Sequence, residues 1–177
     1  MVRGVVDLIT YENCQIYEKV LLELVPEARI SIKLASANIR NFRVKILTDS
    51  FPLSEYIKHF IKKGVSVKIL TTPNACKSAF VTELLGTRNF EVKACARNHM
   101  KLVVVDSRRA YIGSANLTSS GLGTRKASVR NFEIGFITQS KSLLTTVRRI
   151  FDDVWSGRLC DGCLYRDRTD VNCTYPR

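Results

Sequence analysis

The sequence of 177 residues lacks the patterns that would mark a membrane, secreted or repeat protein. No apolar run approaches the roughly 18 residues needed to cross a bilayer, and the start of the chain lacks the long apolar core and cleavage site of a secretion signal. Internal repeats and low-complexity segments are also missing. We therefore expect a single globular domain in the cytoplasm, with no stable membrane association.

Histidine and acidic residues are scarce as well. The chain has two histidines, His59 and His99, and no acidic cluster suited to Mg²⁺, so we expect no catalytic metal and no cofactor. Lys and Arg together number 28 against 16 Asp and Glu, which gives a formal net charge of +12. A positive field attracts polyanions and speeds their encounter. Nucleic acid is the natural partner, and an anionic membrane surface comes second.

Cysteine is unevenly distributed. Three cysteines are scattered in the body of the chain and three cluster near its end: Cys14, Cys76 and Cys95, then Cys160, Cys163 and Cys173. The spacing of Cys160 and Cys163 is that of metal ligands or of a disulfide, but a tetrahedral zinc site needs a fourth ligand. Zinc, a disulfide and free thiols all remain open. We predict a domain over residues 1–157 and an irregular, cysteine-containing tail over 158–177.

Apolar spacing predicts alternating helices and strands. The expected helices cover residues 14–25, closed by Pro26, then 53–63, 76–85 and 140–155, and the expected strands cover 29–37, 44–47, 65–70, 90–95, 99–105 and 109–113. This alternation favours an α/β fold with a mixed β-sheet flanked by helices on both faces, an α/β/α sandwich.

The most informative stretch runs from residue 99 to residue 116 and reads HMKLVVVDSRRAYIGSAN. Side chains alternate along a strand, so His99 and Lys101 would share one face. A turn at 106–108 would return the chain along a second strand, which brings Ser114 and Asn116 beside them. Gly113 would let the backbone pass close to a bound phosphate.

These residue types suit the cleavage of a phosphodiester. Lys101 supplies a positive charge and Ser114 and Asn116 supply donors for the negative charge that builds on the phosphate oxygens. A neutral imidazole can attack phosphorus, so His99 is the predicted nucleophile, and water would then hydrolyse the phosphohistidine. Asp106 falls at the turn, where an aspartate can bond nearby backbone N–H groups.

The pattern His99-x-Lys101-x4-Asp106-x6-Gly113-Ser114-x-Asn116 resembles the HxKxxxxD signature of the phospholipase D superfamily of phosphodiesterases. The similarity continues beyond the motif through Leu117, Thr118, Gly121, Leu122 and the segment Asn131-Phe132-Glu133, which resembles the downstream Asn-x-Glu element of the family. The resemblance implies a catalytic set of six residues: His99, Lys101, Asp106, Ser114, Asn116 and Glu133.

The resemblance also implies a homodimer. Family members often carry the motif twice in one chain, whereas this chain carries it once. The leaving oxygen needs a proton, and His59 reads as a surface or packing residue of a helix. His99 of a second copy would then be the acid. Glu133 would share a strand face with Asn131 and orient an imidazole ring, while the apolar neighbours Phe132, Ile134 and Phe136 would point inward.

We therefore expect a metal-independent nuclease that acts on DNA or RNA. The alternatives are a lipid phosphodiesterase of the phospholipase D type, which would need an apolar anchor, and a non-catalytic nucleic-acid-binding module with a relic site. The sequence leaves open the preference for DNA or RNA, the specificity for sequence or structure, and the biological pathway.

Overall fold

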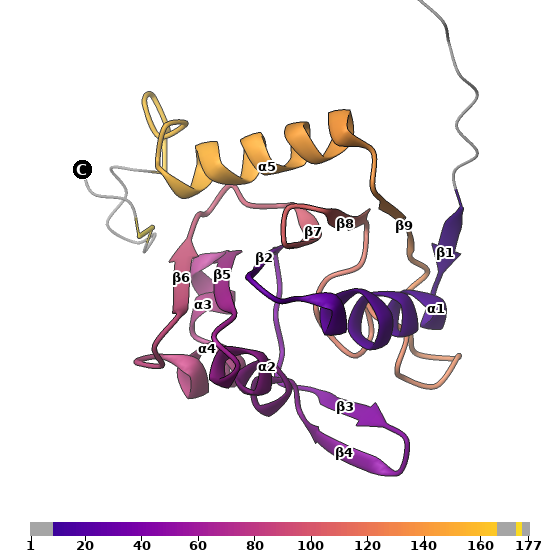
Figure 1. Ribbon diagram of the computed structural model, residues 1–177. Coiled ribbons are helices and arrows are strands. Elements are labelled where there is room, and N and C mark those ends of the chain that lie inside the picture. The colour runs from indigo at the N-terminus through magenta and orange to yellow at the C-terminus, as the bar shows by residue number, and fades with distance from the viewer. Residues whose placement is uncertain (1–8, 166–172, 175–177) are drawn as a thin grey trace, which may run out of the picture.

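The computed structural model describes residues 9–165 and 173–174, and a mixed sheet forms its centre (Figure 1). In that part of the chain seven strands pair in the order β1-β9-β8-β7-β2-β5-β6. They are β1 (Thr10–Glu12), β2 (Ser31–Ser36), β5 (Ser66–Thr71), β6 (Phe90–Ala94), β7 (Lys101–Val105), β8 (Arg109–Gly113) and β9 (Ile134–Thr138). The pairs β2–β5 and β5–β6 are parallel, and the other pairs are antiparallel. The predicted mixed sheet is confirmed.

A separate two-stranded hairpin and five α-helices complete the described structure. The hairpin consists of β3 (Arg43–Ile46) and β4 (Asp49–Pro52), and the helices are α1 (Cys14–Tyr17), α2 (Leu53–Lys62), α3 (Pro73–Cys76), α4 (Ala79–Leu84) and α5 (Lys141–Trp155). The first helix continues beyond α1 as a π-helical stretch and a final 3-10 turn, Val25–Glu27. Pro26 therefore lies inside the last turn and does not close the helix before it. Proline is tolerated at the start of such a turn, where its missing N–H is not needed.

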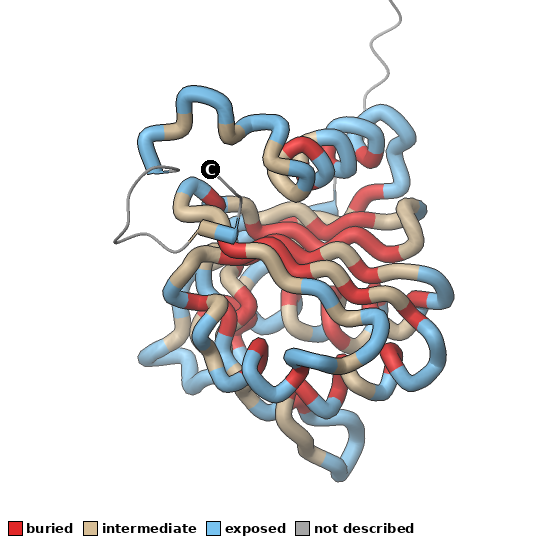
Figure 2. The backbone as a smooth tube through the Cα atoms, turned by 90° about the vertical axis from the view of Figure 1, so that its left-hand side faces the viewer, coloured by how far each residue is buried: buried red, intermediate tan, exposed pale blue. Residues whose placement is uncertain are grey.

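The sheet carries a hydrophobic core on each face, as the sandwich prediction requires. The first helix, α2 and α4 pack on one face, and α5 packs on the other (Figures 1 and 2). All five residues of β7 are buried, and they divide by alternation: Val103 and Val105 join the larger core, and Leu102 and Val104 join the core beneath α5. A strand that is buried on both faces has a continuous apolar sequence, and β7 has such a sequence from Leu102 to Val105.

None of the helices in the described part of the chain is long and apolar enough to cross a bilayer.

The strand register brings several strand ends to one edge of the sheet. The parallel strands β2 and β5 end there, at Ser36 and Thr71. Ser36 pairs with Lys101, the first residue of β7, and Gly113, the last residue of β8, pairs with Gly135 near the start of β9. Open α/β sheets bind ligands at the carboxyl ends of their parallel strands, so we call this the active edge of the sheet.

Asp106 lies at the opposite edge, in the turn between β7 and β8. Its carboxylate accepts hydrogen bonds from three successive backbone N–H groups at the start of β2, those of Arg29, Ile30 and Ser31, at 2.9, 2.9 and 2.7 Å. Burial acts to raise the pKa of Asp106, but these three bonds outweigh it and hold the pKa below its ordinary value. The carboxylate therefore joins the turn to β2.

We predict that Asp106→Ala destabilises the fold, because three backbone donors lose a charged acceptor. For a partly exposed site we expect a loss of about 1–2 kcal/mol, which lowers the melting temperature by roughly 2–8 °C in a domain of this size. Because the folded pKa is depressed, this stabilisation is present above the ordinary aspartate pKa of about 4 and is lost as the pH falls through the folded value. The difference in melting temperature between the wild type and the variant should therefore narrow in acid.

The exposed Asp49 provides the matched control for this change. Thermal unfolding of Asp49→Ala should follow the wild type at every pH. Equal melting temperatures for the two variants at neutral pH would contradict the role given to Asp106.

Candidate active site

Lys101 begins β7 at the active edge and is 9% exposed. Its Nζ donates a hydrogen bond of 2.9 Å to the backbone oxygen of His99. Burial lowers the pKa of Lys101, and the nearby Glu133 carboxylate opposes this shift, with a net value below the ordinary one. The side chain thus presents a partly buried amine whose position is fixed by one bond and whose charge is supported by Glu133.

Ser114 and Glu133 form a small polar network next to this lysine. Ser114 Oγ donates to Glu133 Oε2, and Asn131 Nδ2 donates to the other carboxylate oxygen at 3.0 Å. Ser114 follows β8 directly and also bonds the start of β9: its Oγ accepts from the Ile134 N–H at 3.1 Å. The carboxylate is therefore held by two side chains and acts on Lys101 through space.

Asn116 is oriented by contacts from the end of β2. Its Oδ1 accepts from the Asn38 backbone N–H at 3.1 Å and lies 3.3 Å from Ser36 Oγ. A backbone N–H can only donate, so the amide oxygen faces Asn38 and the amide NH₂ group is directed elsewhere as a donor. Ser36 Oγ in turn accepts from the Leu117 N–H at 3.0 Å. Because Ser36 pairs in register with Lys101, the lysine and the asparagine flank the same residue.

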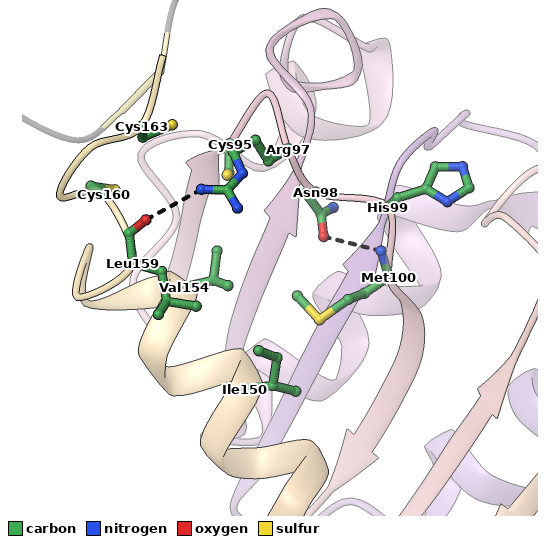
Figure 3. Close-up of a pocket in the computed structure, with 10 residues that line it drawn as sticks. All are labelled: Cys95, Arg97, Asn98, His99, Met100, Ile150, Val154, Leu159, Cys160 and Cys163. Carbon is green, nitrogen blue, oxygen red and sulfur yellow. Dashed lines mark hydrogen bonds between the residues drawn. The ribbon is translucent and has the colours of Figure 1, made fainter. Parts of the chain in front are cut away.

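His99 lies beside this group but not on a strand. The prediction that His99 and Lys101 share a strand is wrong, because β7 begins at Lys101. The connection from β6 is held by the buried Asn98, whose Nδ2 donates to the Leu70 backbone oxygen at 3.2 Å and whose Oδ1 accepts from the Met100 N–H at 3.4 Å (Figure 3). The imidazole itself is exposed.

The structure therefore brings together most of the predicted residues. Lys101, Ser114, Asn116 and Glu133 lie at the active edge, with His99 next to them. Asp106 does not join them: the five-residue strand β7 separates it from this group, a span of roughly 15 Å.

The segment before β9 differs from its prediction. Asn131, Phe132 and Glu133 are not part of a strand, because β9 begins at Ile134. Phe132 is 96% exposed and Ile134 is 53% exposed, so the inward orientation predicted for them is wrong. The segment is held by bonds to its own loop and to the first helix, such as that from the Asn13 N–H to the Glu133 oxygen at 3.1 Å. Within one chain Glu133 bonds side chains other than the imidazole.

The structure gives a reason for glycine at position 113 that the sequence analysis did not predict. A Cβ built there would lie 2.2 Å from Tyr111 Oη, and a Cβ at Gly135 would lie 2.4 Å from the Tyr111 ring. The ring is buried across both glycines, and burial raises the pKa of Tyr111 to about 12. The two glycines thus make room for a tyrosine, and the close approach of a phosphate to Gly113 stays a prediction.

Three residues that position the site escaped the sequence analysis. Ser36 and Asn38 orient Asn116, and Asn98 holds the connection that carries His99. Ser36 and Asn38 lie at or just beyond the end of β2, and Asn98 lies three residues before β7. A polar residue next to a buried strand is the signal that could have singled them out. Across the described ranges, 9–165 and 173–174, no group of three or more His, Cys, Asp or Glu side chains is arranged to hold a metal ion.

Comparison with known proteins relates this arrangement to one family. The family model described as "Cardiolipin synthase, PLD-like domain" matches residues 10–155. The DISARM protein DrmC of Bacillus paralicheniformis is 25% identical over 132 residues, which cover 66% of this chain and 52% of that protein. The chain therefore spans about half the length of this relative.

Solved structures share the fold at low sequence identity. NucT from Helicobacter pylori superposes with a TM-score of 0.65 at 15% identity and covers 85% of this chain and 97% of its own. Nuc from Salmonella typhimurium, a phospholipase D family member, gives 0.61 at 16% identity, with 85% and 95% covered. TrmBL2, an archaeal chromatin protein that binds DNA, gives 0.56 at 16% identity, with 87% and 54% covered.

The family model spans the whole sheet from β1 to the end of α5. The motif that resembled the phospholipase D signature lies inside this match. The chain therefore belongs to the family of phospholipase D-like (PLD-like) domains.

Proposed function

We propose that this protein is a metal-independent phosphodiesterase that cleaves nucleic acid at a site shared by two copies of the chain. One observation carries the proposal. Lys101, Asn116 and the Ser114–Glu133 pair meet at a single edge of the sheet, with the exposed imidazole of His99 beside them. A cation, a neutral donor, a carboxylate and a nucleophile are thus available at one place for a phosphodiester.

Charge on the phosphate is stabilised by Lys101 and Asn116. Lys101 has three N–H donors and uses one on the His99 oxygen, which leaves two for phosphate oxygens. The Asn116 NH₂ group supplies a neutral donor in a fixed orientation. Ser114 donates its single proton to Glu133, so its first role is to hold that carboxylate close to Lys101. Donors fixed in advance stabilise a developing charge without the cost of reorganising.

The chemical steps follow from the imidazole. A neutral His99 nitrogen attacks phosphorus and forms a P–N bond, while the bond from phosphorus to the leaving oxygen breaks. The leaving oxygen takes a proton from a protonated imidazole. Water then attacks the phosphohistidine, passes a proton to that second imidazole, and releases a phosphomonoester and the free His99. Both imidazoles return to their starting states.

The second imidazole comes from another copy of the chain, because His59 cannot supply it. His59 lies near the end of α2 and packs edge-on against Phe60, with ring centroids 5.5 Å apart. The chain after α2 enters β5 at Ser66, whose N–H bonds the Ile30 oxygen at the start of β2. His59 therefore lies towards the edge of the sheet opposite to His99.

An exposed apolar patch beside the site supports pairing of two copies. Val129, Phe132 and Ile134 are 55%, 96% and 53% exposed, and they flank the Glu133 that belongs to the site. Large exposed apolar side chains gathered in one place mark interaction surfaces. A two-fold axis through this region would bring two copies of His99 towards each other.

Nucleic acid is favoured over lipid by the charge around the site. The chain carries +12 overall, and the connection between β8 and β9 contributes the exposed Arg125 and Lys126, while Arg97 is exposed two residues before His99. Basic side chains around a phosphodiester site bind a polyanionic backbone. TrmBL2, which shares this fold over 54% of its chain, is a DNA-binding protein, and this is consistent with such a substrate.

We predict that the protein cleaves labelled DNA or RNA, but not phosphatidylcholine, when EDTA is added with the substrate. His99→Ala should lower turnover by about 10³-fold or more, because the nucleophile is lost, and should leave binding measured by fluorescence anisotropy within a few-fold. His59→Ala is the matched control and should remain active. Strict dependence on Mg²⁺, or full turnover by His99→Ala, would contradict the mechanism.

Mixing experiments test the shared site. If each site needs two copies of His99, a ninefold excess of His99→Ala chains, mixed by reversible unfolding, leaves most wild-type chains paired with inactive partners. Activity per wild-type chain should then fall to roughly a tenth. The same excess of His59→Ala, whose own chains keep His99, should leave activity per total chain at the wild-type value. Undiminished activity in the presence of His99→Ala would exclude a site that two copies build.

Phe132→Glu should weaken the pairing, because a charge replaces an exposed apolar side chain at the proposed interface. We expect the dissociation constant to rise about tenfold or more, as measured by light scattering over a dilution series. Leu47→Glu, at a residue that is 99% exposed on the separate β3–β4 hairpin, is the matched control. A dimer that withstands Phe132→Glu as well as Leu47→Glu would remove this patch from the interface.

A further inference from the structure

Three cysteines line a pocket that adjoins the proposed phosphodiester site, because His99 also belongs to its lining. The pocket has a volume of about 210 Å³, and Cys95, Cys160 and Cys163 lie around it together with Val154 of α5 (Figure 3). Cys95 follows β6, whereas Cys160 and Cys163 follow α5. Two segments more than 60 residues apart in sequence therefore contribute cysteines to the wall of one pocket.

The fourth cysteine of this region comes from the end of the described chain. The Thr174 N–H donates to the Ala94 oxygen at 3.0 Å, and the Ala94 N–H donates to Thr174 Oγ1 at 2.7 Å. The Ala96 N–H donates to Cys173 Sγ at 3.4 Å. Because Ala94 and Ala96 are the two neighbours of Cys95, these bonds place Cys173 next to Cys95.

Local geometry and electrostatics agree with this grouping. Cys160 and Cys163 belong to one tight turn, in which the Cys163 N–H donates to the Cys160 oxygen at 3.1 Å. Burial raises the pKa of Cys95, a hydrogen bond from the Arg97 backbone opposes the shift, and the nearby thiols of Cys173, Cys160 and Cys163 raise it further. Each of the other three thiols therefore lies near enough to Cys95 to act on its pKa.

We propose that Cys95, Cys160, Cys163 and Cys173 form a four-thiolate metal site. Thiolates select Zn²⁺ or an iron–sulfur cluster over the hard cations, and the x2 spacing of Cys160 and Cys163 is that of two ligands from one turn. The four sulfurs do not surround a common point in the structure. Binding therefore closes the turn after α5 onto the end of β6, as metal binding commonly couples to local folding.

Such a site would also stabilise the connection between β6 and β7, which carries His99. Cys95 lies four residues before His99, and the intervening Asn98 is bonded to the end of β5. A metal centre on Cys95 would add a second anchor at the start of this connection and tie it to the chain that follows α5. The site is structural: none of its four ligands belongs to the proposed phosphodiester site, and the proposed chemistry does not pass through it.

The test measures metal content and stability in the full chain and reads no turnover, so its result is independent of the proposed function. The protein is purified from cells supplied with zinc, and in a second arm it is reconstituted anaerobically with iron and sulfide. We expect either about one zinc ion per chain or matching amounts of iron and sulfide with visible absorption. Removing the metal should lower the melting temperature.

Single substitutions assign the ligands. Cys163→Ser and Cys173→Ser should each lower the bound metal about tenfold or more, whereas Cys14→Ser, at an exposed cysteine of α1, should retain it. Circular dichroism confirms that each variant is folded, and a variant that unfolds is replaced by the Ser variant of Cys160. Less than a tenth of an equivalent of metal in the wild type by both routes, equal metal in the Cys163 and Cys14 variants, or disulfides among the four cysteines in peptide maps would each overturn the proposal.

Discussion

The antiparallel pairing of β7 with β2 and β8 is the constraint on which the site depends. β7 is buried along its whole length, so a slip of one residue would exchange the side chains between the two cores and is strongly disfavoured. In this register Lys101 lies opposite Ser36, and Gly113 lies opposite Gly135. At the other end of β7, Asp106 bonds the backbone at the start of β2, which holds the same register from the opposite edge.

At the active edge burial disfavours the charged form of Lys101, and a negatively charged substrate would favour it. Lys101 is almost buried, and burial disfavours its charged form. The Glu133 carboxylate offsets this, and Glu133 is itself held by Ser114 and Asn131. A phosphodiester placed against Lys101 and Asn116 would supply a further negative charge. Buried groups with shifted pKa values collect at functional sites, and this one lies where the family motif predicts it.

Periodic features of the sequence predicted most of the framework. The apolar stripe over 140–155 became α5 (Lys141–Trp155), and the strands expected near 65–70 and 90–95 became β5 and β6. Both signals are local, because they arise from one face of one element packing on a core. The spacing of the motif also predicted that Lys101, Ser114 and Asn116 would meet, since a turn between two short strands leaves few other arrangements.

The parts that the sequence did not reveal depend on contacts between distant residues. β1 was missed because it pairs with β9, more than 120 residues later. Ser36 and Asn38 reach Asn116 across about 80 residues of chain. His99 and Phe132 were assigned to strands by alternation alone, whereas hydrogen bonds of Asn98 and Asn13 hold their segments in place of a strand ladder. An alternating sequence cannot distinguish a strand from a segment that such hydrogen bonds hold, because the alternation says nothing about the partners of the backbone.

The central claim is that the imidazole of His99 becomes bonded to phosphorus during turnover. The most direct test is rapid quenching of the enzyme with excess labelled substrate, followed by peptide mapping by mass spectrometry. The account predicts an adduct in which His99 is bonded to the phosphorus of a retained substrate fragment. It should be labile in acid, formed before steady state and absent from the His99→Ala variant. Turnover without any covalent adduct, or an adduct on another residue, would contradict it.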